Sequence, residues 1–163
     1  MTIYALSSGP GVSGVAVIRV SGKYTAAVVK KITNSKLPPP RVATLKKFNK
    51  NGKKELIDEG VVIWFPAPNS YTGEDLAEFH LHGSVAVIDD FLLALSSIVG
   101  LRPAEAGEFS KRALINGKME LTQVEALGDL ILAETKKQKD QAVKQIKGEL
   151  SDRYNRWRKG LII

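Results

Sequence analysis

The spacing of apolar residues changes along the chain, and this change constrains the fold more than any other feature of the sequence. In the first part, short apolar runs such as Leu56–Phe65 and Leu76–Leu81 carry the β-branched and aromatic residues typical of strands. From Thr122 onward, apolar residues recur at the three-and-four spacing of one helix face. The sequence therefore predicts a strand-rich first part followed by a long helical tail.

The same patterns predict the other elements of the first part. Strands are expected over Ile3–Leu6, Gly14–Val20 and Val42–Phe48, and helices over Lys23–Lys31, Val85–Val99 and Glu108–Ile115. Asn51-Gly52 is a turn signal between two of the strands and predicts an open, lysine-rich hairpin tip. Gly117 permits a left-handed stop after the helix that precedes it.

Composition excludes several classes of protein. No apolar run approaches the roughly 20 residues that cross a bilayer, so we expect a soluble protein without membrane contact. The absence of cysteine excludes disulfides, thiolate nucleophiles and thiolate metal ligands. The sequence also contains no G-x-x-x-x-G-K-[ST] stretch, so these residues provide no P-loop for GTP.

The net charge of +7 is concentrated in two basic clusters. The first comprises Lys46, Lys47, Lys50, Lys53 and Lys54, and the second Lys136, Lys137, Lys139, Lys144, Lys147, Arg153, Arg156, Arg158 and Lys159. A basic balance attracts polyanions, of which RNA is the natural candidate. The alternative is an ordinary solvated surface. Few aromatic residues are interleaved, so a base-stacking surface is not indicated.

One apparent motif has the wrong context. Gly9–Gly14 matches the dinucleotide fingerprint G-x-G-x-x-G, which requires a helix directly after it. Here Val15–Val20 follows, and its β-branched residues favour a strand. We therefore interpret the glycine-rich segment as a turn between strands.

Glu78 is the first candidate for a binding residue. In an extended Leu76–His82, Glu78, His80 and His82 share one face and the apolar residues the other. A carboxylate there can accept two parallel hydrogen bonds from an amidine-like N–H pair, such as a pterin or guanine edge presents. The alternative is a surface glutamate on a half-exposed strand. Two histidines alone do not complete a metal-ligand set, and hydrogen bonds to nearby loops are the more common role, so no metal is predicted.

Arg19 and Lys118 are the other two candidates. Arg19 interrupts an apolar run and must be paired or hydrogen-bonded, either to a ligand or in an internal ion pair, for example with Glu78. Lys118 follows Gly117 at a corner between two helices, where it can reach a ligand or an acid. The alternative for Lys118 is a solvated lysine.

Three long stretches carry a family resemblance. They are YALSSGPGVSGVAVIRVSG near the start, NSYTGEDLAEFHLHG at Asn69–Gly83 and GEFSKRALINGKMELTQVEAL at Gly107–Leu127. In this order they closely resemble the N-terminal domain of the MnmE/TrmE family of tRNA-modifying GTPases, from Thr2 to about Glu149. The family's GTP-binding half has no counterpart in these residues.

The resemblance implies a fold and a set of contacts. The family's N-terminal domain is similar to folate-binding domains of the T-protein type, which implies an α+β fold with a mostly antiparallel sheet and flanking helices over residues 1–119. Residues 120–163 would begin the central helical domain. The resemblance implies a homodimer that binds 5-formyltetrahydrofolate through Arg19, Glu78 and Lys118, with no catalytic residue in this part.

The resemblance also implies the reaction and the partners. The folate would supply the one-carbon unit placed on C5 of the wobble uridine in tRNA, together with a flavoprotein of the MnmG/GidA family. GTP, Mg and K would bind only through the G domain, so we expect no turnover by these residues alone. The alternatives are a non-enzymatic RNA-binding or assembly module, and a folate-dependent aminomethyltransferase-like protein.

Some positions depart from the family pattern. The chain has Val12 where many members carry a basic residue, Ser84 where glycine is usual and Leu114 where phenylalanine is usual. Ala104–Phe109 and the basic balance are more similar to mitochondrial members than to bacterial ones. We therefore expect a mitochondrial protein, with the bacterial cytoplasm as the alternative.

Overall fold

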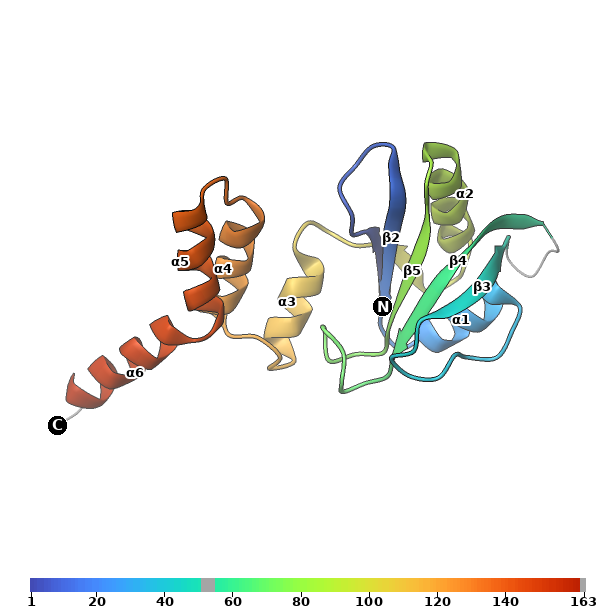
Figure 1. Cartoon of the computed structure of the whole chain (residues 1–163). Coiled ribbons are helices and arrows are strands. Elements are labelled where there is room, and N and C mark those ends of the chain that lie inside the picture. The colour runs from blue at the N-terminus through green and yellow to red at the C-terminus, as the bar shows by residue number, and fades with distance from the viewer. Residues whose placement is uncertain (51–54, 162–163) are drawn as a thin grey trace. The chain divides into compact units, whose positions relative to one another are not determined.

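The structure is a computed structural model that describes residues 1–50 and 55–161. It has α+β architecture, with a six-stranded sheet and helices in the first part and three further helices at the end (Figure 1). The strands are β1 (Thr2–Leu6), β2 (Ser13–Ser21), β3 (Thr44–Asn49), β4 (Leu56–Phe65), β5 (Leu76–Gly83) and β6 (Leu101–Pro103). The helices are α1 (Thr25–Thr33), α2 (Val85–Ser96), α3 (Glu108–Ile115), α4 (Leu121–Ile131), α5 (Lys136–Ile146) and α6 (Glu149–Leu161).

The sheet is antiparallel except at one edge. Its strand order is β3-β4-β5-β2-β1-β6, and among the strand pairs of the described residues only β1–β6 is parallel. The mostly antiparallel sheet that the resemblance implies is therefore confirmed. β2 and β5 are central neighbours, and their register places Arg19 opposite Glu78 and Val17 opposite His80.

The core lies on one face of this sheet. Alternate residues of β2 and β5, among them Ile18, Val20 and Phe79, are fully buried against α1 and α2. Phe79 and Phe91 of α2 pack with ring centroids 5.1 Å apart. The other face carries the polar positions of β5, as the strand alternation predicts. The site residues are consequently fixed on a sheet whose opposite face is packed.

The predicted elements of the first part are largely confirmed. β4 and α3 have the predicted bounds, and the glycine-rich segment before β2 connects two antiparallel strands. The three-residue strand β6 was not predicted, and α2 ends at Ser96 rather than Val99. The predicted turn at Asn51-Gly52, with the hairpin tip around it, lies outside the described residues.

The predicted helical tail from Thr122 is confirmed. It consists of three helices, α4, α5 and α6, with breaks after Ile131 and after Ile146. Thr135 caps α5, because its side chain accepts a hydrogen bond from the backbone N–H of Gln138. Gly148 has a φ of 88°, which ends the preceding helix in the left-handed region.

The chain divides into two compact units, Met1–Phe109 and Ser110–Ile163. The first contains the whole sheet with α1 and α2. In the second, α4 packs on α5 and α5 contacts α6. The predicted boundary between residues 119 and 120 stays a prediction. Across residues 1–50 and 55–161, no helix is both long enough and apolar enough to span a membrane.

Candidate functional site

The centre of the candidate site is a hydrogen-bonded ion pair between Arg19 and Glu78. The two residues are cross-strand partners on β2 and β5. Nη2 of Arg19 donates to Oε1 of Glu78 at 2.8 Å, and Nε donates to the same oxygen at 3.1 Å. The side chains are 25% and 20% exposed, so the pair is shielded yet reachable by a ligand. From the sequence, Arg19 could either contact a ligand or form an internal ion pair, and the structure shows the ion pair.

Two aromatic rings flank the guanidinium. The Cζ atom of Arg19 lies 5.1 Å from the centre of the Tyr71 ring and 5.6 Å from the centre of the Phe109 ring. Both distances fall within the roughly 6 Å range of a cation–π contact. Tyr71 and Glu78 belong to the segment Asn69–Gly83, and Phe109 belongs to Gly107–Leu127. Residues from all three motif stretches therefore meet around Arg19.

The loop that carries Tyr71 is tied to the end of β2. The hydroxyl groups of Ser21 and Thr72 are 2.7 Å apart, and both residues are fully buried. Ser21 also donates to Oε2 of Glu74 at 2.8 Å, and the backbone N–H of Gly22 donates to the carbonyl oxygen of Asp75 at 2.9 Å. These bonds hold the loop, and with it the Tyr71 ring, beside Arg19.

The helix that carries Phe109 is anchored in a similar way. The guanidinium of Arg102 on β6 donates to both oxygens of Glu108 at 2.7 and 2.6 Å, and Glu108 is buried. The backbone N–H of Glu105 donates to the same carboxylate at 2.9 Å. The hydrogen bond to Glu108 raises the pKa of Arg102 above its ordinary value. This two-pronged pair fixes Glu108, the first residue of α3, beside Arg102 of β6.

The two oxygens of Glu78 have different surroundings. Oε1 accepts both N–H groups of Arg19, which uses its two lone pairs. Oε2 lies 3.7 Å from Nε2 of His80, beyond hydrogen-bond distance. Among the described residues, that Nε2 is buried and has no hydrogen-bond partner. Oε2 is therefore the oxygen that this pair offers to a ligand.

His82, the other strand histidine, has a structural role. Its Nδ1 lies 2.8 Å from Oδ1 of Asp58 on β4, and its backbone N–H donates to Oδ2 at 2.8 Å. Burial by itself raises the pKa of Asp58, but the hydrogen bonds from His82 and from the backbone N–H of Glu59 together bring the pKa below its ordinary value. Within the two described ranges, no cluster of three or more His, Cys, Asp or Glu side chains is arranged to hold a metal ion.

Lys118 follows α3. Gly117 has the left-handed φ of 66° that the sequence predicts, and the backbone N–H of Lys118 donates to the carbonyl oxygen of Ala113 at 2.7 Å. The side chain of Lys118 is exposed. Lys118 belongs to the second compact unit, whereas Arg19 and Glu78 belong to the first. The structure joins the first two of the three predicted site residues, and the contribution of Lys118 to the site stays a prediction.

A shallow hollow lies on the same sheet face as the ion pair, although Arg19 and Glu78 do not themselves line it. Its volume is about 370 Å³, which lies in the range of small-molecule sites. It is lined by Gly14, Val15, Ala43, Glu59, Gly60, Val61, Ile63, His80, Leu81 and His82. The register places Ile63 directly opposite Glu78, so this partly apolar surface begins beside the carboxylate.

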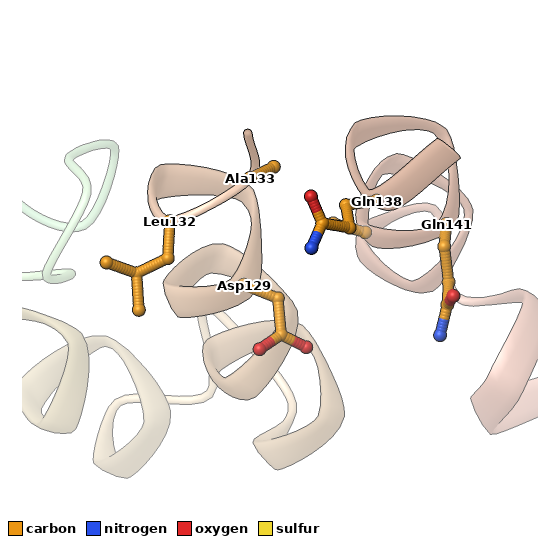
Figure 2. Close-up of a pocket in the computed structure, with 6 residues that line it drawn as sticks. Asp129, Leu132, Ala133, Gln138 and Gln141 are labelled. Carbon is orange, nitrogen blue, oxygen red and sulfur yellow. The ribbon is translucent and has the colours of Figure 1, made fainter. Parts of the chain in front are cut away.

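A second hollow lies between α4 and α5 in the helical unit. Figure 2 shows Asp129 of α4 and Gln138 and Gln141 of α5 around it, and its volume is about 190 Å³. Gln138 already completes the capping box with Thr135. None of Arg19, Glu78 and Lys118 lines this hollow, and we assign it no role in binding.

Comparison with known proteins decides the family. The family model described as GTP-binding protein TrmE N-terminus matches residues 2–118. The chain belongs to the TrmE/MnmE family. The resemblance stated from the three motif stretches is therefore confirmed.

Individual relatives agree with this assignment. The chain is 55% identical over 162 residues to the tRNA modification GTPase MnmE of Pelagibacter ubique, covering 99% of this chain and 37% of that protein. It is 56% identical over 156 residues to the 5-taurinomethyluridine-[tRNA] synthase subunit GTPB3, mitochondrial, of Danio rerio, covering 96% and 31%. It is 50% identical over 157 residues to the human protein of the same name, covering 96% and 32%. The chain thus spans about a third of the length of these relatives, and bacterial and mitochondrial proteins match it at similar identity.

Sequence reasoning singled out Arg19 and Glu78 but missed the aromatic pair around them. Tyr71 and Phe109 stand in two of the motif stretches, beside the residues that carried the resemblance. Both stand close to the glycines and charged residues of these stretches, and this position could have marked them as candidate site residues. Their convergence on one guanidinium is a tertiary property that spacing alone does not reveal.

Proposed function

We propose that this chain is the folate-binding, dimer-forming part of a tRNA-modifying GTPase and that it binds 5-formyltetrahydrofolate through Arg19, Glu78 and Lys118. The observation that carries the proposal is a half-buried carboxylate, Glu78, held from one side by Arg19. A shielded carboxylate with a remaining acceptor oxygen suits a heterocycle that presents N–H donors.

The residues present fit a pterin in three respects. Oε2 of Glu78 is available as an acceptor, since Arg19 uses only Oε1. The flanking rings of Tyr71 and Phe109 hold Arg19 in place, which orients the carboxylate before a ligand arrives. The hollow of about 370 Å³ on the same sheet face provides partly apolar surface for the rest of the molecule.

Each residue has a role in this proposal. Glu78 accepts from the N–H edge of the pterin, Arg19 orients Glu78, and Lys118 contributes a positive charge for polar atoms of the ligand. When bound, the folate supplies the one-carbon unit that is placed on C5 of the wobble uridine.

The wider reaction requires more than these residues. We assign GTP hydrolysis, with Mg and K, to the part of the relatives' length that this chain does not span. A second copy of the chain, a flavoprotein of the MnmG/GidA family and the substrate tRNA complete the proposed assembly. The names of the relatives support the reaction class, since they describe a tRNA modification GTPase and a 5-taurinomethyluridine-[tRNA] synthase subunit.

A mitochondrial location is part of the proposal. It rests on Ala104–Phe109 and on the basic balance of the chain. Bacterial and mitochondrial relatives match at similar identity, so imaging of the tagged full-length protein in its own cells is the test.

Calorimetric titration with 5-formyltetrahydrofolate tests the folate site. The wild-type chain should bind stoichiometrically, and Glu78→Ala should lose about 2–3 kcal/mol of binding free energy, because a charge-assisted contact is removed. Asp89→Asn is the matched control, since Asp89 is an exposed carboxylate on α2, which covers the other sheet face. Absence of binding by folded wild-type protein would overturn the proposal.

RNA binding by the second basic cluster is the other candidate function. The lysines of α5 are exposed, and so are Arg153, Arg156, Arg158 and Lys159 on α6. Binding driven by phosphate contacts should weaken steeply as salt rises, by a slope proportional to the phosphates neutralised. A folate site should show little salt dependence. Titration of a tRNA at several salt concentrations separates the two functions.

A further inference from the structure

His80 lies next to Glu78 on the polar face of β5, and its imidazole is poorly satisfied. Its Nε2 atom is buried and lacks a hydrogen-bond partner within residues 1–50 and 55–161. Oε2 of Glu78 lies 3.7 Å from this atom, whereas a hydrogen bond from nitrogen to oxygen spans about 2.7–3.2 Å. Buried polar atoms without partners are uncommon in native proteins, and each requires an explanation.

The number of hydrogen bonds that the carboxylate of Glu78 can accept explains why Nε2 of His80 has no partner. A ligand edge with two N–H groups needs one lone pair on each carboxylate oxygen. Arg19 already uses both lone pairs of Oε1, so one of its bonds must give way when such a ligand binds. Oε2 accepts one ligand N–H and keeps a second lone pair. A shift of about 0.5–1 Å would bring Nε2 of His80 within bonding distance of that lone pair.

We infer that His80 is a positioning residue for Glu78, which donates from Nε2 to Oε2 and holds the carboxylate when a ligand displaces part of the Arg19 contact. The inference rests on the proposed function, because it concerns the same site. It assigns the buried Nε2 a partner that is already in place and requires only a small movement.

Calorimetric titration of 5-formyltetrahydrofolate into four proteins tests this role. His80→Leu should bind about ten-fold more weakly than wild type, because a hydrogen bond to a charged group is lost. His80→Gln retains a side-chain N–H donor and should restore most of the affinity. Asp89→Asn on α2, which packs on the other face of the sheet, is the control and should keep the affinity. Binding by His80→Leu that equals wild type would overturn the inference.

A measurement on the ligand-free protein separates this inference from the proposed function. The chain contains two histidines, so side-chain nuclear magnetic resonance can follow the resonances of each imidazole. Glu78→Gln should shift the resonances of His80 and leave those of His82 unchanged, whereas Asp58→Asn should do the reverse. If wild type binds no folate, the proposed function fails, and these resonances still decide the contact. His80 resonances that do not respond to Glu78→Gln overturn the positioning role.

Discussion

Two residues of the site could be predicted because each is a charged residue in a strand that is otherwise largely apolar. Arg19 interrupts an apolar strand, and Glu78 occupies the polar face of another, so both could be singled out before the structure was known. Their mutual hydrogen bonds follow from the β2–β5 register, which depends on how strands far apart in the sequence pair. The saturation of Oε1 by Arg19 depends on side-chain rotamers, which no sequence pattern specifies.

Replacement of Phe109 tests whether the aromatic rings keep Arg19 in place. Phe109→Leu removes one of the two rings beside the guanidinium and should weaken 5-formyltetrahydrofolate binding about two- to five-fold. The variant Phe109→Tyr keeps a ring at the same position and should bind like wild type. Calorimetric titration measures both. Equal affinity of all three proteins would show that the ring does not support the site.

Replacement of Asp58 tests the pairing with His82. The pKa of Asp58 is lowered in the folded state, so its ionised form contributes stability above the ordinary carboxyl pKa, and this contribution is lost as pH falls through the folded-state value. Asp58→Asn should therefore reduce the free energy of unfolding by about 1 kcal/mol near neutral pH. The difference from wild type should shrink below about pH 4. Urea unfolding at several pH values measures it, and a constant difference down to acid pH would contradict this account.

Whole elements were predicted well where one periodicity dominates. In β5, buried residues alternate with less buried ones, as the sequence of Leu76–His82 predicts. β4 and α3 also form within their predicted bounds. The helical tail was predicted from the spacing of its apolar residues, but this spacing does not give the positions of the two breaks. Local chemistry decides the breaks instead, through the cap at Thr135 and the left-handed Gly148. The strand β6 has three residues, too few to show a period.

A pair of glycine replacements tests the break between α5 and α6. Gly148 has open space around it but a φ of 88°, which an L side chain adopts only at a cost. Gly148→Ala should therefore lower the stability of the helical unit by about 1 kcal/mol. Gly128 lies inside α4 with equally open space and no positive φ, so Gly128→Ala should raise stability by up to about 1 kcal/mol. Thermal unfolding followed by circular dichroism measures both, and a stabilising Gly148→Ala would mean that the break is not required.

At the scale of the whole molecule, the two compact units differ in how much they bury. The first unit has a core of large side chains, including Phe48, Phe79 and Phe91. In the second unit, the buried hydrophobic side chains among the described residues are Ala113, Ala126 and Ala142. Large apolar side chains there, such as Trp157 at 59% exposed, remain in contact with solvent. Since apolar burial is the main source of stability, the first unit should account for most of it.

Hydrogen exchange measures this difference directly. Isolated helices of about 12 residues are marginal in water, so the amides of α5 and α6 should exchange with little protection. Amides of the central strands β2 and β5 become exposed only when the core opens. They should exchange at least about a thousand-fold more slowly than those of α5 and α6. Repeating the measurement at two protein concentrations separates the properties of one chain from those of a dimer, because protection that comes from association increases with protein concentration. Strong protection of α5 and α6 in dilute protein would contradict the inference that the helical unit is only weakly stabilised by its own packing.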